Sequence, residues 1–421
     1  MNETVQPTFV DLDGDAEAAL IAGARFAEPV KGLTHGFYKY PARFSPAFVR
    51  AAIDVFTEPG DTVLDNHVGG GTTVVEAVAS GRHAVGVDIS SLAEFVSSVK
   101  ATVFSEAELD VLAEWATKAP NAIDLRKQSI HFGHYAELGY YKHLQHKSRW
   151  RLRKAIEQGM AAAISLAQPN LEAFGRCAVL RTAQWALDGR KQLPTIGEFR
   201  ECLGVTATAM VAGARALRTA SEAHGAPTNA LIVNRSAAGL EDDVRLANIR
   251  PKLVVTSPPY PGVHVLYHRW QVDGRKESAL PFMIAKRLDG SGAAYYTMGD
   301  RKAADQLNYF KNIKASMGSV AAVANHDTII VQMVAFGDAA RQLPRYLAVM
   351  AEIGLEELLL PSLQGERDGR LWRAVPGRRW YSRQRGETPA SQEVVLIHRK
   401  KTHGCESPQV IATLPLASPE S

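Results

Sequence analysis

Cysteine is scarce in this chain of 421 residues, and what is missing narrows the classes of protein to which it can belong. The three cysteines, Cys177, Cys202 and Cys405, are too few and too scattered for a disulfide framework or a four-ligand zinc site. We expect reduced cysteines and no metal. No uncharged apolar run reaches the length of about 18 residues that a membrane span needs, and the acidic N-terminus lacks the features of a signal peptide. We therefore expect a cytoplasmic protein with no membrane partner.

The composition is that of a globular protein, because 46% of the residues are apolar and 22% are charged. The net charge of +4 is too small to establish a polyanionic partner, but the basic residues are concentrated. Residues 126–200 hold 13 Lys and Arg against 5 Asp and Glu, and residues 366–401 hold 10 against 4. Two such blocks favour a phosphate-binding surface, and a solvated helix face with an Arg-rich loop is the alternative.

Residues 61–104 contain one alternating unit. DTVLD predicts a short strand, HVGGGTT a glycine-rich turn, VVEAVASG a helix and HAVGVDI a second strand. A strand, helix and strand in this order make a right-handed crossover, so the pattern predicts a parallel sheet.

The pattern then changes twice. Residues 105–228 have helical spacing, whereas ALIVN, KLVVTS and DTIIVQMVAF predict strands and LEELLLPS and SQEVVLIHRK an antiparallel pair at the sheet edge. We expect an α/β fold in which a helical insertion interrupts one Rossmann-like sheet. The predicted parts are residues 1–104, the helical insertion 105–228, the second part of the sheet domain 229–402, and a polar tail 403–421.

The first candidate site spans Asp65 to Thr73, with Asp88 at the end of the next predicted strand. Glycines let the backbone approach a ligand, and an acid at the end of the second strand can accept hydrogen bonds from ribose hydroxyls. The pattern indicates a nucleoside cofactor, with a plain tight turn as the alternative. The spacing is not that of a nicotinamide site, and no Lys follows the glycines as in a nucleotide-phosphate loop.

The second candidate site is Thr256-Ser257-Pro258-Pro259-Tyr260, directly after the strand KLVV. The prolines fix the backbone, leave carbonyls without local N–H partners, and hold an aromatic ring outward. This arrangement favours binding of a planar amine.

These segments resemble the amino-group DNA methyltransferases, which methylate cytosine N4 or adenine N6 from S-adenosylmethionine. HGFYKYPARFSPAFVRAAI (35–53) is similar to the family's first cofactor motif, VLDNHVGGGTT to its glycine loop, and TSPPY to its catalytic tetrapeptide with the preceding residue. Arg378-Arg379-Trp380-Tyr381 and the strand EVVLIHRK also look like parts of such enzymes. The resemblance implies a class I methyltransferase sheet and covers residues 31–100 and 229–401, and it does not extend to residues 105–228.

The resemblance also implies roles. Ser257 and the Pro258 carbonyl would accept hydrogen bonds from the target amine, with Pro259 shaping the loop and Tyr260 stacking on a base rotated out of the duplex. The SPPY form favours cytosine N4 over adenine N6. The residues implied around S-adenosylmethionine are Arg43, Phe44, Asp65, Gly69, Gly71, Thr72 and, at the ribose, Asp88.

Two departures leave alternatives open. Asn66-His67 stand where the family usually has Pro-Phe, which keeps a nucleic-acid-binding regulator without transfer activity as one alternative and makes His67 a minor candidate for a base. Asn234 or Ser236 stands where an acid is common for the adenine amine. Methylation of RNA or of a protein glutamine is another alternative, although the protein-glutamine enzymes carry Asn in place of Ser257. Trp270 is expected in the core.

The partner that the resemblance implies is double-stranded DNA, with a cognate restriction nuclease or a defence system as a further partner in restriction-modification. The basic helical insertion leaves the sheet near the edge of both candidate sites, so it can form one wall of a DNA cleft. The residues expected at the DNA are Arg149, Arg151 and Arg153, around Trp150, and Arg378 and Arg379.

Overall fold

The fold is taken from a computed structural model of the chain. It describes residues 8–28, 30–40, 44–128, 131–146, 148–225, 227–246, 248–261, 270–272, 276–287, 289, 298–299, 306–366, 368–374 and 392–401. None of the helices within these ranges combines the length and apolar character that crossing a membrane requires.

One mixed sheet organises the molecule, with strands in the order β3-β2-β1-β4-β7-β10-β8 and β9 paired to β10. The first five strands are parallel, and β10 runs antiparallel to its neighbours β7, β8 and β9. The predicted Rossmann-like α/β fold and the antiparallel pair at its edge are therefore confirmed. The strands are β1 (Thr62–Asp65), β2 (His83–Asp88), β3 (Ala230–Asn234), β4 (Leu253–Thr256), β7 (Ile329–Val334), β8 (Leu355–Leu358), β9 (Leu371–Ala374) and β10 (Gln392–Lys400).

Alternation along the central strands builds a core on each face of the sheet. Val63 and Leu253 point to the face covered by α1 (Gly14–Arg25), α2 (Pro46–Phe56) and α3 (Thr72–Ala79). Leu64 and Val254 point to the opposite face, against α11 (Leu307–Val323) and α12 (Ala339–Glu352). Successive residues of a strand face opposite sides of the sheet, so these strands contribute side chains to both cores. Their sequences are therefore continuous runs of apolar residues.

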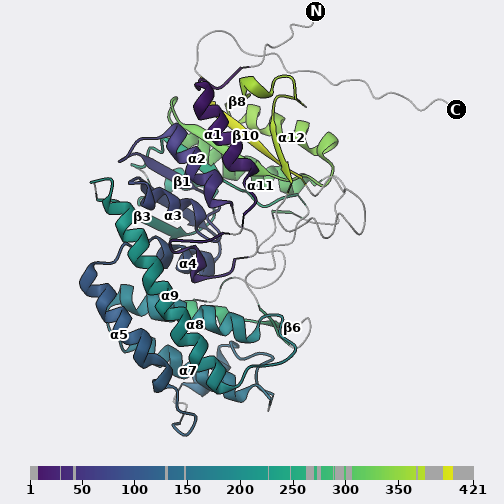
Figure 1. Cartoon of the computed structure of the whole chain (residues 1–421). Helices are drawn as coiled ribbons and strands as arrows, with labels where there is room; N and C mark the ends of the chain where they lie inside the picture. The colour runs from purple at the N-terminus through teal and green to yellow at the C-terminus, as the bar shows by residue number, and fades with distance from the viewer. Residues whose placement is uncertain are drawn as a thin grey trace, which may run out of the picture.

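The predicted helical character of residues 105–228 is confirmed, and these helices gather at one end of the sheet (Figure 1). The helices are α5 (Glu106–Ala122), α6 (Phe132–Glu137), α7 (Trp150–Ile164), α8 (Pro169–Leu187) and α9 (Ile196–Glu222). Their core also includes residues from later in the chain, in the hairpin β5 (Trp270–Val272) and β6 (Lys276–Ser278) and in α10 (Leu280–Ala285).

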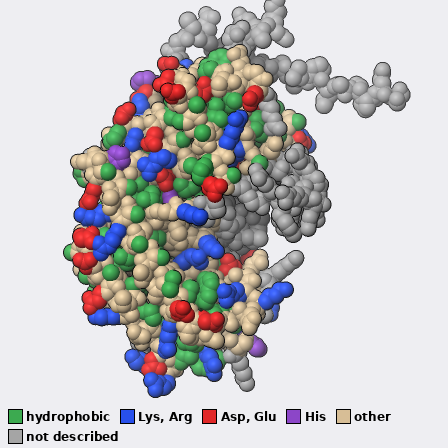
Figure 2. Space-filling model, in the orientation of Figure 1, with side chains coloured by type: hydrophobic (Ala, Val, Ile, Leu, Met, Phe, Trp, Pro, Cys, Tyr) green, Lys and Arg blue, Asp and Glu red, His purple; other side chains and the backbone are tan. Residues whose placement is uncertain are grey.

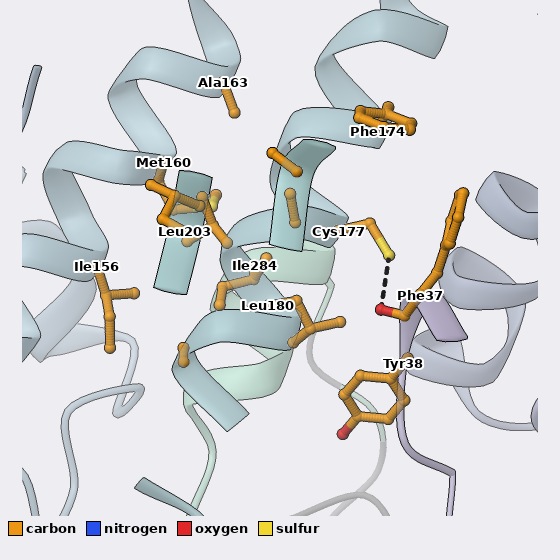
Figure 3. Packing of buried hydrophobic residues seen from close by; sticks show 14 of the residues in the cluster. Phe37, Tyr38, Ile156, Met160, Ala163, Phe174, Cys177, Leu180, Leu203 and Ile284 are labelled. Atoms are coloured by element: carbon orange, nitrogen blue, oxygen red, sulfur yellow. Dashed lines mark hydrogen bonds between the residues drawn. The ribbon is translucent and has the colours of Figure 1, made fainter. Parts of the chain in front are cut away.

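The segment before α2 joins the helical core to the sheet. Phe37, from the turn η1 (His35–Phe37), packs edge-on against Phe174 of α8 and lies beside Cys177, whose thiol donates to the Phe37 carbonyl at 3.8 Å (Figure 3). Trp270 is buried and donates through Nε1 to the Tyr38 hydroxyl at 3.0 Å, so its predicted core position is confirmed. The helical core therefore supports the first part of the cofactor-like motif at residues 35–53.

Candidate functional site

Both candidate sites lie at the carboxyl edge of the parallel strands. Asp65 ends β1, Asp88 ends β2, Asn234 ends β3 and Thr256 ends β4. The chain moves outward from β1 in one direction and from β4 in the other, so the strand order reverses between these two neighbours. A crevice outside such a reversal point is where open α/β sheets bind ligands.

The side chain of Asp65 connects the start of the glycine loop to helix α3, which follows the loop. Its carboxylate accepts from the His67 backbone N–H at 3.0 Å and from the Thr73 hydroxyl at 2.7 Å. Gly71 has φ of 78° at the start of α3, and a Cβ there would lie 2.8 Å from Ser97 Oγ. A left-handed backbone and this close approach to α4 (Ser91–Ala101) both require glycine at position 71.

Asp88 holds the other side of the loop. Its carboxylate accepts from the Gly69 N–H and from the Ser90 N–H, each at 2.9 Å. Asn234, at the end of the next strand, donates to the carbonyls of Asp88 and Ile89, each at 3.0 Å. The backbone at Asp88, the acid expected to bind a ribose, is therefore held in place by β2 and by Asn234 at the end of β3.

The two acids share an unusual electrostatic setting. Burial raises the pKa of Asp65 and of Asp88 to about 6 in each case. Within the part of the chain that the structure describes, no Lys or Arg forms an ion pair with either carboxylate. Carboxylates that are buried without a cation are well suited to a ligand that brings hydroxyl or ammonium donors.

The second candidate site begins at the buried Thr256 and turns away from β4. The Ser257 hydroxyl donates to the Met333 carbonyl on β7 at 3.0 Å and also interacts with the Tyr260 hydroxyl, and its oxygen has lone pairs that can accept hydrogen bonds. Pro258 is buried, and no donor among the described residues reaches its carbonyl. Tyr260 is half-buried, and its hydroxyl donates to Glu393 at 2.6 Å. The loop thus presents two acceptors and a fixed ring.

His67 links the glycine loop to the end of β4, and both Asn66 and His67 link it to α11. His67 Nδ1 lies 3.3 Å from Thr256 Oγ1, and its Nε2 lies 3.3 Å from Ser316 Oγ on α11. The Asn66 amide donates to the same Ser316 hydroxyl at 3.2 Å. Burial lowers the pKa of His67 to about 3, so the imidazole is neutral near pH 7. These residues hold the glycine loop against the end of β4.

The remaining predicted cofactor residues are placed less directly. Thr72 is buried as the first residue of α3. Phe44 is partly buried and packs against the core that includes Phe48 of α2. The ring centroids of Phe44 and Phe48 are 6.1 Å apart. Arg43 lies outside the described residues.

The predicted DNA-contacting arginines differ in their surroundings. Arg151 is exposed, and its guanidinium carbon lies 5.7 Å from the ring centroid of Trp150. Figure 2 shows Lys and Arg side chains interspersed with Asp and Glu over the visible face of the helical end of the molecule. The Arg153 guanidinium is half-buried over Phe132 and Tyr141, at 4.3 and 5.1 Å from their ring centroids. Arg149 is half-buried and precedes α7. Arg378 and Arg379 lie outside the described residues, in the connection between β9 and β10.

Several residues that support the site were not predicted from the sequence. The buried Lys100 ammonium donates to the Gly70 carbonyl at 2.6 Å, and Ser97 Oγ donates to the Gly69 carbonyl at 3.1 Å. Gln184, on α8, exchanges hydrogen bonds with the backbone of Lys39. The spacing of Ser97 and Lys100 on one helix after Asp88 is the only local pattern that could have indicated such support.

Comparisons with known proteins match the first part of this site. A protein-family model described as DNA methylase matches residues 24–97. The Type II methyltransferase M.MjaII of Methanocaldococcus jannaschii is 32% identical over 66 residues, which are 16% of this chain and 12% of that protein. The match therefore spans only a small part of the relative's length.

Among solved structures, two of the rRNA methyltransferase aviRa from Streptomyces viridochromogenes are similar to this chain at 10% identity. One covers 89% of this chain and 96% of its own, with a TM-score of 0.35; the other covers 92% and 94%, with a TM-score of 0.32. The fold assignment depends on the strand order given above.

Proposed function

Because residues 24–97 carry the signature of an amino-methyltransferase family, we propose that this chain methylates DNA on an exocyclic amino group. Cytosine N4 is the favoured target over adenine N6, and S-adenosylmethionine is the methyl donor. The observation that carries the proposal is the juxtaposition of the glycine loop and the Ser257–Tyr260 loop across the reversal point between β1 and β4, bridged by His67 and Thr256.

The donor set at the glycine loop fits S-adenosylmethionine. Asp88 would accept from the ribose hydroxyls, and Asp65, with Gly69, Gly71 and Thr72, would surround the methionine part, whose ammonium suits a carboxylate without a cation. When bound, this cofactor supplies a methyl group activated by a sulfonium. Gly69 and Gly71 both have positive φ, so the conformation of this loop favours glycine at both positions.

The Ser257–Tyr260 loop would position the amine. An exocyclic amine conjugated to a ring is a weak nucleophile, so hydrogen bonds to its N–H groups and alignment with the methyl group supply most of the rate enhancement. Ser257 Oγ is available as an acceptor because its own proton is donated to Met333. The Pro258 carbonyl would be the second acceptor, and the Tyr260 ring would stack on the extruded base. His67 is neutral and already hydrogen-bonded, which supports a bridging role over a role as base.

The substrate would be double-stranded DNA, with the basic helical segment as one wall of its binding cleft. The exposed Arg151 beside Trp150 supports this assignment, because a cation and an aromatic surface suit phosphates and bases. A partner nuclease or defence system belongs to the same proposal and rests on the family resemblance alone.

The proposal is tested by transfer of a tritiated methyl group from S-adenosylmethionine to unmethylated duplex DNA, with RNA and a glutamine-bearing protein as parallel substrates. We expect label in DNA, and hydrolysis to nucleosides should locate it on N4-methylcytosine. Label on N6-methyladenine would correct the base preference. Cofactor binding by calorimetry without label in any substrate would contradict the proposal and favour a nucleic-acid-binding regulator.

A further inference from the structure

The hydroxyl of Tyr260 is not left to solvent. It donates to Glu393 Oε1 at 2.6 Å, and Glu393 Oε2 accepts from Arg373 Nε and from Arg373 Nη2, both at 2.8 Å. The side chains of Arg373 and Glu393 are only 5% and 7% exposed. Each oxygen of this buried carboxylate therefore accepts from a defined residue. One of the two residues is Tyr260, whose ring is proposed to stack on the target base.

The strands fix this arrangement. Glu393 on β10 stands directly opposite Arg373 on β9 in the register of the sheet, so their side chains share one face. Arg373 Nη1 also donates to the carbonyl of Ala24 on α1 at 3.3 Å. The ion pair is thus anchored on two strands and a helix, and its position depends little on the loop that carries Tyr260.

Burial makes the contact directional. A buried carboxylate without a partner is costly, and Arg373 compensates the charge of Glu393 while leaving Oε1 for one more donor. The Tyr260 hydroxyl fills that place. A ring fixed at both its Cβ and its hydroxyl has one orientation, whereas a ring fixed only at Cβ can rotate about two side-chain torsions.

We infer that Glu393, held by Arg373, is a positioning residue that fixes the ring of Tyr260 in the orientation needed to stack on the target base. This inference rests on the proposed methylation of DNA. Glu393 touches no reacting atom in this arrangement, so its loss should lower kcat and leave cofactor binding unchanged. A preoriented ring helps to align the amine with the methyl group during transfer, and this alignment supplies most of the rate enhancement in amine methylation.

The test compares four variants for methyl transfer to DNA: Tyr260→Phe, Glu393→Gln, the double variant, and Glu357→Gln as the matched control. Glu357 of β8 pairs at 2.6 and 2.7 Å with Arg370, the residue before β9, and β8 and β9 both pair with β10. The same substitution there weakens a comparable ion pair that has no bond to the catalytic loop. Steady-state kcat and KM for DNA, the calorimetric Kd for S-adenosylmethionine and the melting temperature are measured for each.

Tyr260→Phe and Glu393→Gln should each lower kcat by about tenfold, the scale of one hydrogen bond to a charged group, with the cofactor Kd unchanged. The double variant should be no slower than the slower single variant, because Glu393→Gln weakens the same contact that Tyr260→Phe removes. The Glu357→Gln control should keep the wild-type kcat. Since Tyr260→Phe deletes a single oxygen, it tests the inference even if Glu393→Gln lowers the melting temperature.

Wild-type kcat in Tyr260→Phe, or losses in the two single variants that multiply in the double variant, would overturn the inference and leave the proposed function intact. A wild-type protein that transfers no methyl group to DNA would instead overturn the proposed function, and with it the inference.

Discussion

Replacing Asp88 with alanine should weaken binding of S-adenosylmethionine by about tenfold or more. Each oxygen of the carboxylate already accepts one backbone N–H, from Gly69 or from Ser90, at 2.9 Å, and each retains a lone pair for one ribose hydroxyl. One hydrogen bond to an ionised acceptor contributes about 1.5–3 kcal/mol, and about 1.4 kcal/mol changes a Kd tenfold. The assay is calorimetric titration with S-adenosylmethionine at pH 8.

A control separates this direct contact from looseness of the glycine loop. Ser97→Ala removes the hydroxyl that donates to the Gly69 carbonyl at 3.1 Å and leaves Asp88 in place. Its cofactor Kd should change much less than that of Asp88→Ala. Equal losses in the two variants would mean that Asp88 acts only by holding the loop.

The same carboxylate should make binding depend on pH. Its folded pKa of about 6 lies above the ordinary value of 3.8 because the group is buried, and the ribose hydroxyls donate to its ionised form. Binding should therefore be complete well above pH 6 and weaken as the pH falls through 6, with Asp65, whose pKa is also about 6, adding to the loss. An unchanged Kd in Asp88→Ala, with the melting temperature intact, would refute this placement of the ribose.

Three further predictions concern other parts of the molecule. Tyr260→Ala removes the ring as well as the hydroxyl, so its kcat on DNA should lie about 10- to 100-fold below that of Tyr260→Phe, the scale of stacking on one base, and equal kcat values in the two variants would argue against stacking. Changing Arg149 and Arg151 together to Gln should make the slope of log affinity for DNA against log salt shallower by about two units, and an unchanged slope would exclude the helical segment as a wall of the DNA cleft. Arg153→Gln should mainly lower the melting temperature, because its guanidinium packs over Phe132 and Tyr141. Burial holds the pKa of His398 at about 3 instead of 6.5. The stability contributed by the neutral imidazole is therefore complete above pH 6.5 and falls by about 1.4 kcal/mol per pH unit as the solution is acidified toward pH 3. In urea unfolding, His398→Gln should lose less stability than the wild type between about pH 7 and 5, and equal losses would contradict the pKa shift.

The central strands and both loops could be predicted from the sequence because their signals are local. The apolar runs before Asp65 and Thr256 end at residues that suit the carboxyl edge of a sheet, and the glycines and prolines that follow constrain the backbone directly. The rule that parallel strands share an edge places both loops at the same edge of the sheet, and the adjacency of β1 and β4 comes from the structure.

The supporting contacts could not be predicted, since they join residues far apart in the chain. Asn66 and His67 stood out in the sequence only as departures from a family pattern, and their partner Ser316 comes from a helix that no motif marked. Glu393 lies in a predicted strand, but its pairing with Arg373 depends on the register of β9, which was not predicted. Arg153 shows a further limit of sequence-based prediction. The count of basic residues in this segment could not reveal that aromatic rings cover the guanidinium of Arg153.

The most direct test of the central claim is single-molecule sequencing of DNA from cells that express the wild-type chain, compared with cells that express Ser257→Ala. The experiment reports both the modified base and its sequence context. We predict N4-methylcytosine at a defined sequence in the wild-type sample and its loss in Ser257→Ala. Unmodified DNA from cells that contain the folded wild-type protein, able to bind S-adenosylmethionine after purification, would contradict the claim that this chain is a DNA methyltransferase.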